Sequence, residues 1–234
     1  MTLPLSNSPS APRARWKDLS TRTLSAALLA PLFLACLWVG GWFWWTVLFL
    51  LFSQLMREWL AMARPRWGFW AWPVGFAYTL APTCGFLFAI RQESVVGLGN
   101  ALFVVLLVWA ADIGAYLFGR LIGGPKLAPA ISPGKTWSGA LGGLLCAALV
   151  GLAAARLSAA PMLPALLIGA GLGIVSELGD LLESAIKRHF GVKDSGTIIP
   201  GHGGLLDRLD ALLAVATAAI ILVPTRGPGV EIWR

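Results

Sequence analysis

The sequence predicts an all-α membrane protein, a polytopic bundle of about seven transmembrane helices with its active site at the cytoplasmic helix ends. Three observations support this prediction. The chain is 57% hydrophobic and only 12% charged, whereas about a quarter of the residues are charged in an ordinary soluble domain. Its mean hydropathy is +0.76. The apolar residues also gather in runs of roughly 20, the length that a helix needs to cross the hydrocarbon core.

These apolar runs define the expected helices in chain order. A window of about 19 residues places them near 24–40, 42–63, 69–90, 98–119, 138–155, 161–183 and 205–224. Residues 1–23 are rich in Ser and Pro and lack a convincing small-residue cleavage site, so we expect a retained, disordered cytoplasmic tail. Residues 226–234 would form a short C-terminal tail.

Residues 24–97 are predicted to be N-terminal scaffold helices. They carry few charges and most of the Trp residues, which favour the headgroup region at helix ends. Arg57 and Glu58 are charged exceptions in the second expected helix. They could mark a site, but near a helix end we interpret them as side chains that extend to the membrane interface.

The basic residues predict the orientation of the bundle. With the N-terminus inside, most Lys and Arg residues face the cytoplasm, and only Arg91, Arg156, Arg226 and Arg234 face the other side. The net charge of +7 therefore reflects the positive-inside rule and the lipid bilayer, and it does not indicate a nucleic-acid partner.

Residues 98–225 are expected to form the catalytic transmembrane region, because polar residues concentrate there. Two predicted cytoplasmic loops, 119–139 and 187–204, are dense in Gly, Pro, Lys and Ser. We find no internal repeat and no soluble domain large enough to hold its own core.

Carboxylates are predicted to converge at the cytoplasmic ends of the last two helices. Steps of three and four residues place one set on a single helix face: Glu177, Asp180, Ser184, Lys187 and Arg188. Asp207 and Asp210 share a face at the start of the next helix. Two antiparallel helices joined by a short loop hold Asp180 and Asp207 at similar depth, and such a pair suits Mg²⁺. Alternatively, Asp207 caps its helix and Asp210 pairs with Arg208 or Lys187.

Basic residues set among glycines favour phosphate as the ligand, since cationic heads and backbone N–H groups can approach it together. This set contains Lys135, Lys187, Arg188, Lys193 and Arg208. For Arg120 and Lys126 the alternative is an ordinary positive-inside role. His202 lies between glycines and could carry a proton, bind a ligand or simply order the turn.

The residues from Ser184 to Asp210 read S-x-I-K-R-x4-K-D-x-G-x2-I-P-x-H-G-G-L-x-D-R-L-D. This run resembles the signature of the phosphatidate cytidylyltransferases, also called CDP-diacylglycerol synthases. Further upstream segments are similar to that family, at 112–120, 126–129, 132–137 and 179–181. The resemblance covers about residues 105–225, and Ile113 and Glu177 depart from it.

The resemblance implies an all-helical enzyme of phospholipid biosynthesis in a bacterial inner (cytoplasmic) membrane. It would transfer CMP from CTP to phosphatidate and release pyrophosphate, with Mg²⁺ held by Asp180 and Asp207. The matching motifs place substrate binding on Asp112, Ser132, Lys135, Thr136, Ser184, His202, Gly203 and Arg208. They place catalysis on Lys187, Arg188, Lys193, Asp194 and Asp210. Whether two copies form a homodimer stays open.

Two other functions deserve comparison with this expectation. A transporter or ion pathway would use Glu177 and Asp180 as coupling carboxylates, but the charges gather at helix ends rather than at the midplane, and no inverted repeat is evident. A CTP-dependent polyprenol kinase would also need Mg²⁺ and basic loops. Its products would be a phosphorylated lipid and CDP instead of a CDP-lipid and pyrophosphate.

Overall fold

The computed structural model describes residues 30–84, 95–198, 203–226 and 231–234. Its elements begin with a short helix at Ala30–Val39. They continue with α2 (Gly41–Trp67), η1 (Gly68–Trp70), α3 (Ala71–Cys84), α4 (Val95–Leu121), β1 (Lys126–Ala128), β2 (Ser132–Thr136), α5 (Trp137–Leu157), α6 (Met162–Phe190) and α7 (Leu206–Arg226). The chain is mostly helical, as predicted. The expected tail at 1–23 lies outside the described residues.

The described residues contain four segments that are long and apolar enough to cross a membrane: Gly41–Leu80, Val95–Leu121, Trp137–Leu157 and Met162–His189. This supports an integral membrane protein, but the predicted count of about seven crossings is not confirmed. Two expected crossings, 42–63 and 69–90, overlap Gly41–Leu80. In this segment α2 and α3 are joined by η1 and pack side by side, with Phe52 against Phe76 and Trp59 against Tyr78. The helix at Ala30–Val39 is shorter than the roughly 20 residues that a crossing requires.

Two local signals fix helix ends near the polar residues. The hydroxyl of Thr136 accepts a hydrogen bond from the backbone N–H of Gly139 at 3.1 Å, which caps the start of α5. α6 ends at Gly191, whose φ of 75° lies in the left-handed region and whose N–H reaches back to the Arg188 carbonyl. Gly191 therefore ends α6 directly after its polar last turn.

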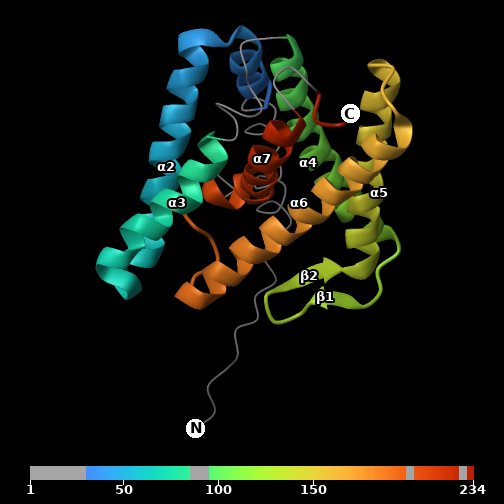
Figure 1. The fold of residues 1–234 in the computed structure, drawn as a ribbon. Helices are drawn as coiled ribbons and strands as arrows, with labels where there is room; N and C mark the ends of the chain where they lie inside the picture. Colours follow the sequence, from blue (N-terminus) through green and yellow to red (C-terminus); the bar gives the residue numbers. More distant parts are fainter. Residues whose placement is uncertain (1–29, 85–94, 199–202, 227–230) are drawn as a thin grey trace, which may run out of the picture.

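Close backbone packing joins α5 to its neighbours α4 and α6. A Cβ added at Gly169 of α6 would lie 2.6 Å from the Ala147 carbonyl oxygen, and one at Gly143 of α5 would lie 2.9 Å from the Ala111 carbonyl oxygen. Because glycine has no side chain, the backbones of two apolar helices can come into direct contact at these positions. α7 lies between α2 and α3 on one side and α4 and α6 on the other (Figure 1).

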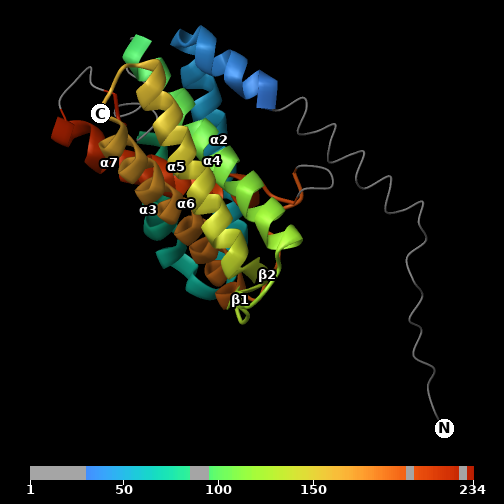
Figure 2. The ribbon, with the colours of Figure 1, turned by 90° about the vertical axis from the view of Figure 1, so that its right-hand side faces the viewer.

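A two-stranded antiparallel hairpin connects α4 to α5, pairing Lys126 with Thr136 and Ala128 with Ser132. The all-α prediction did not include it, because its strands have only three and five residues within a Gly- and Pro-rich segment. The hairpin lies at the same end of the bundle as the last turns of α6 (Figures 1 and 2). α5 then leads away from it, so Arg156 lies at the opposite end.

The last four residues pack against that opposite end. The backbone N–H of Ile232 donates to Asn100 Oδ1 at 2.9 Å, and Trp233 Nε1 donates to Ser158 Oγ at 2.8 Å. The indole ring of Trp233 also lies 4.9 Å from the ring of Phe103. The segment expected to be a tail is therefore anchored to α4 and α5 over residues 231–234.

Candidate active site

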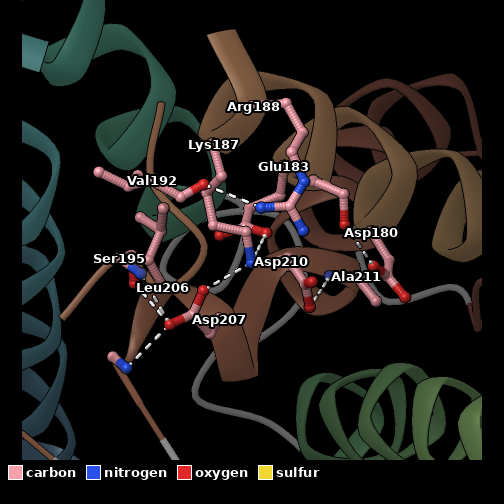
Figure 3. A network of polar contacts seen from close by, with 12 residues as sticks. Asp180, Glu183, Lys187, Arg188, Val192, Ser195, Leu206, Asp207, Asp210 and Ala211 are labelled. Atoms are coloured by element: carbon pink, nitrogen blue, oxygen red, sulfur yellow. Dashed lines mark hydrogen bonds and ion pairs between the residues drawn. The ribbon is translucent and has the colours of Figure 1, made fainter. Parts of the chain in front are cut away.

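Polar side chains form two neighbouring groups where the ends of α6 and α7 meet. The first, called the Lys135 cluster, contains Asp112 of α4, Lys135 of β2, Glu177 and Asp180 of α6, and Asp210 of α7. The second, called the Asp207 cluster, contains Glu58 of α2, Glu183 and Lys187 of α6, Ser195 and Asp207. Figure 3 shows Asp180 and Asp210 of the first group near Glu183, Lys187 and Asp207 of the second, with Asp180 and Glu183 on successive turns of α6.

Lys135 ties the hairpin to α6 through two ion pairs. Its Nζ atom lies 2.9 Å from Glu177 Oε2 and 2.7 Å from Asp180 Oδ2. Burial alone would lower the pKa of the Lys135 ammonium, but the adjacent Asp180 and Glu177 carboxylates outweigh that effect and raise its pKa above the ordinary value. Lys135 therefore stays charged through the neutral range.

Asp180 lies at the centre of the negative charge in the Lys135 cluster. Its charge acts on both Asp112 of α4 and Asp210 of α7, so three helices contribute carboxylates to one region. Ser184, one turn along α6, donates a long hydrogen bond to Asp180 Oδ1 at 3.4 Å. The structure thus brings together four of the residues that the sequence predicted as site residues.

Asp207 is held by four hydrogen bonds. Its Oδ1 accepts from Lys187 Nζ at 2.6 Å. Its Oδ2 accepts from the N–H of Gly204 at 2.9 Å, and from the N–H and Oγ of Ser195 at 2.9 and 3.0 Å. Burial would raise the pKa of Asp207, but these bonds from Lys187, Gly204 and Ser195 lower it below its ordinary value. Asp207 therefore ties the α6–α7 connection, at Ser195 and Gly204, to the first turn of α7.

Lys187 points inward rather than toward water. Its Nζ lies 2.6 Å from both Glu183 Oε2 and Asp207 Oδ1, and the residue is 9% exposed. The sequence placed Lys187 among the basic residues that favour phosphate, whereas in the structure two carboxylates hold its ammonium between α6 and α7. Arg188, its neighbour, is exposed and donates to the Val192 carbonyl at 3.0 Å.

Glu183 was not recognised from the sequence. Its side chain is completely buried, and neither carboxylate oxygen makes a hydrogen bond of normal geometry within the described part of the chain. The Lys187 ammonium balances its charge in an ion pair. The available signal was the spacing of four residues between Glu183 and Lys187, which places an acid and a base on one helix face.

Glu58 of α2 also belongs to the site, and its interpretation as an interfacial side chain is wrong. The residue is 4% exposed. Its carboxylate accepts hydrogen bonds from Gln54 Nε2 at 2.7 Å, from Ser195 Oγ at 3.1 Å and from the N–H groups of Leu205 and Leu206 at 2.9 and 2.8 Å. A carboxylate inside an apolar helix was the signal that could have found it.

The remaining predicted residues lie outside these two clusters. Lys193, Asp194 and Arg208 are exposed, and Ser132 is half-buried on β2. Thr136 is buried and caps α5. Gly203 has a φ of 88°, in the left-handed region that favours glycine, directly before the turn into α7. His202 lies outside the described residues.

The donor chemistry of the site fits a hard cation that also binds phosphate. Among the described residues, no group of three or more His, Cys, Asp or Glu side chains is placed to hold a metal by itself. Mg²⁺ commonly uses only one or two carboxylates, with substrate phosphate oxygens and waters as its other ligands. Asp180 and its neighbours Asp112 and Asp210 supply oxygen donors of that kind.

Comparison with known proteins gives a consistent family. Residues 67–225 match the model of the cytidylyltransferase family. The chain is 38% identical over 253 residues to a phosphatidate cytidylyltransferase of Brucella suis biovar 1 (strain 1330), covering 85% of this chain and 91% of that protein. It is 48% identical over 141 residues to a phosphatidate cytidylyltransferase of Staphylococcus aureus (strain COL), covering 59% of this chain and 54% of that protein.

Proposed function

The chain belongs to the cytidylyltransferase family, and from this membership we infer that it transfers CMP from CTP to phosphatidate, giving CDP-diacylglycerol and pyrophosphate. One observation carries the inference beyond the family match. Within the matched residues, carboxyl groups of α4 and α7 interact with Asp180 of α6, beside Lys135 of the hairpin and Arg208 of α7. A phosphate-transfer reaction needs this combination.

The reaction is an in-line displacement at phosphorus. A phosphate oxygen of phosphatidate forms a bond to the α-phosphorus of CTP, and the bond from that phosphorus to the bridging oxygen of pyrophosphate breaks. The attacking oxygen already belongs to an anion near neutral pH, so no general base is required. Catalysis then depends on positioning the two substrates and on neutralising the charge of the leaving group.

The basic side chains divide into two roles in this proposal. Lys135 and Lys187 each lie between two carboxylates, so they fix the geometry of α6 relative to the hairpin and to α7. Arg188, Lys193 and Arg208 are exposed near the same helix ends. We assign these three the contacts to substrate phosphates, because an exposed cation can meet a nucleotide that arrives from water.

We further propose that Mg²⁺ takes part, with Asp180 and Asp207 as its protein ligands. When bound, the ion would neutralise negative charge on the phosphates of CTP. Asp180 supports this assignment because its carboxylate lies 2.7 Å from Lys135 Nζ and is close enough to Asp112 and Asp210 to interact with both. Asp207 is included because it matches the second metal-binding carboxylate of the family, and Lys187, Gly204 and Ser195 hold it in place.

The substrates also suggest a location in the cytoplasmic (inner) membrane of a bacterium. Phosphatidate has two acyl chains and can enter sideways from a leaflet, while CTP comes from the aqueous side. A site at the ends of apolar helices serves both substrates. The Brucella and Staphylococcus relatives are bacterial proteins, which agrees with this placement.

The test is an assay of the purified protein in detergent with phosphatidate and CTP labelled at the α-phosphate, with and without EDTA. We expect label in a CDP-lipid, release of pyrophosphate and loss of both with EDTA. Labelled CDP as the released product, with an unlabelled phosphorylated lipid, would instead indicate a lipid kinase. Full activity in EDTA would contradict the Mg²⁺ proposal and leave the transferase assignment intact.

A further inference from the structure

We propose that Glu58 of α2 is a positioning residue for this reaction, holding the start of α7, and with it Asp207, at the active site. This role in the reaction rests on the proposed function. Glu58 lies before the residues 67–225 that match the family, in the part of the chain expected to be scaffold. Its contacts nevertheless lead directly to the Asp207 cluster.

The carboxylate of Glu58 is buried in the candidate membrane segment Gly41–Leu80. An ionised group toward the centre of a membrane helix costs about 2.5–3.5 kcal/mol on insertion scales, so it requires compensation. Oε1 accepts from Gln54 Nε2 and from the Leu205 N–H, and Oε2 accepts from Ser195 Oγ and from the Leu206 N–H. Two of these four donors belong to the segment between α6 and α7, and a third is the first residue of α7.

Two of the donors are backbone N–H groups at the start of α7. α7 begins at Leu206, and the first N–H groups of a helix have no carbonyl partner inside the helix. A local Ser, Thr, Asp or Asn side chain usually supplies the acceptor. Here the acceptor for Leu205 and Leu206 comes from another helix, 147 and 148 residues earlier in the chain.

Ser195 links Glu58 to Asp207. Its Oγ atom lies 3.1 Å from Glu58 Oε2 and 3.0 Å from Asp207 Oδ2, and its own N–H donates to Asp207. A hydroxyl has one proton, so it donates to one of the two carboxylates at a time. The position of the Asp207 carboxylate is therefore coupled to that of Glu58.

Two glycines allow the loop to approach this carboxylate. A Cβ at Gly196 would lie 2.9 Å from Glu58 Oε1, and a Cβ at Gly204 would lie 2.6 Å from Glu58 Oε2. Real Cβ atoms do not come so close to an oxygen without displacing it. Glycine at both positions therefore lets the loop pack directly against the Glu58 carboxylate.

The experiment compares Glu58→Gln with Ser195→Ala in the full chain. The amide of Gln offers one oxygen where the carboxylate offers two, so one helix N–H group loses its acceptor. We expect Glu58→Gln to lower kcat at least about tenfold while the KM for CTP changes less than about threefold, since misplaced catalytic groups act on the transition state. Hydrogen exchange at residues 203–209 should accelerate.

Glu231→Gln is the matched control, because it makes the same chemical change at a residue that pairs with Arg234 at the other end of the bundle. It should leave kcat and the exchange of residues 203–209 unchanged. Ser195→Ala removes only the bridging hydroxyl and serves if Glu58→Gln fails to fold. Its loss of kcat should not add to that of Glu58→Gln in the double variant.

An unchanged kcat in folded Glu58→Gln, or in Ser195→Ala, would overturn the proposal. The proposal would also be overturned if Glu231→Gln lost as much kcat and thermal stability as Glu58→Gln. Removing a carboxylate charge anywhere would then have the same effect. The function fails separately: if the wild-type protein makes no CDP-lipid, the transferase assignment is wrong. The hydrogen-exchange comparison still tests whether Glu58 holds α7 in that case.

Discussion

Each of two lysines in the site is shared by two carboxylates. Lys135 contacts Glu177 and Asp180, and Lys187 contacts Glu183 and Asp207. Removing one member of a buried ion pair leaves the other charge without compensation, which is usually more costly than the pair itself is favourable. At the residue scale, substitutions of these lysines therefore affect folding as well as chemistry.

Lys187→Ala should destabilise the protein by about 3 kcal/mol or more, the usual cost of leaving a buried charge without its counter-ion. Glu183 and Asp207 would lose their shared cation, and Glu183 is completely buried. Thermal unfolding in detergent measures the effect, with Arg188→Ala as the neighbouring control because Arg188 is exposed. Equal melting temperatures for the two variants would contradict the buried bridge.

Asp180→Asn and Asp207→Asn should each remove most CMP transfer while expression and helicity persist. Losing one carboxylate weakens the affinity for Mg²⁺ without emptying a core position. CMP transfer is measured against Mg²⁺ concentration, and Glu231→Gln, at the other end of the bundle, shows the effect of losing a carboxylate charge alone. Near wild-type turnover of either variant at saturating Mg²⁺ would rule out its metal role.

The sequence was most informative about residues within one helix. The spacing of Asp180, Ser184 and Lys187 placed them on one face of α6, and the structure brings all three to the site. It could not reveal the partners of Glu58, because hydrogen bonds between residues 147 apart depend on how α2 packs beside α7. Local periodicity carries no information about that packing.

At the scale of elements, the side chain of Lys135 attaches the hairpin β1–β2 to α6. Lys135 is the described residue of the hairpin that makes ion pairs with α6, to Glu177 and Asp180. Its strands were missed in the sequence because they are short and contain Gly and Pro. The attachment nevertheless sets where Ser132 and the hairpin turn lie relative to the site.

Lys135→Ala should therefore loosen the hairpin. Hydrogen exchange at residues 126–136 is expected to rise at least about fivefold, since local openings follow the loss of tertiary contacts. Lys126→Ala is the matched control, because Lys126 is an exposed lysine of the same hairpin. An equal change in both variants would mean that the ion pairs with α6 do not hold it.

The same attachment should be insensitive to pH in the neutral range. The pKa of Lys135 is raised above 10.5, so its contribution is complete below the unfolded value and is lost only as pH rises through the higher folded value. Protection of the hairpin, corrected for the intrinsic exchange rate, should stay constant between about pH 6 and 9. A loss of protection within that interval would contradict the assigned charge state.

For the whole molecule, the main structural result is that one end of the bundle is polar and the other is closed by packing. The hairpin and the end of α6 lie at the polar end, and Ile232 and Trp233 pack on α4 and α5 at the opposite end. The charge distribution in the sequence predicted the polar end, but residues 226–234 were expected to be a tail rather than a packed segment. The predicted count of about seven crossings stays unconfirmed, because four segments of sufficient length and hydropathy are found among the described residues.

The orientation of the molecule can be tested with single cysteines in a background without the natural ones. A cysteine at position 193, exposed at the polar end, should react with an impermeant maleimide only after cells are permeabilised. One at position 157, where Leu is 90% exposed, should react in intact cells. The reverse pattern would invert the predicted topology.

The link between Glu58 and α7 also has a consequence for synthesis. The ribosome makes α2 first, and the N–H groups that satisfy its carboxylate emerge 147 and 148 residues later. At about 5–20 residues per second, Glu58 waits roughly 7–30 s for these partners. During this interval the Glu58 carboxylate lacks the donors that Ser195, Leu205 and Leu206 supply in the finished fold. The packing of α2 around Glu58 is therefore completed only after α7 has been made.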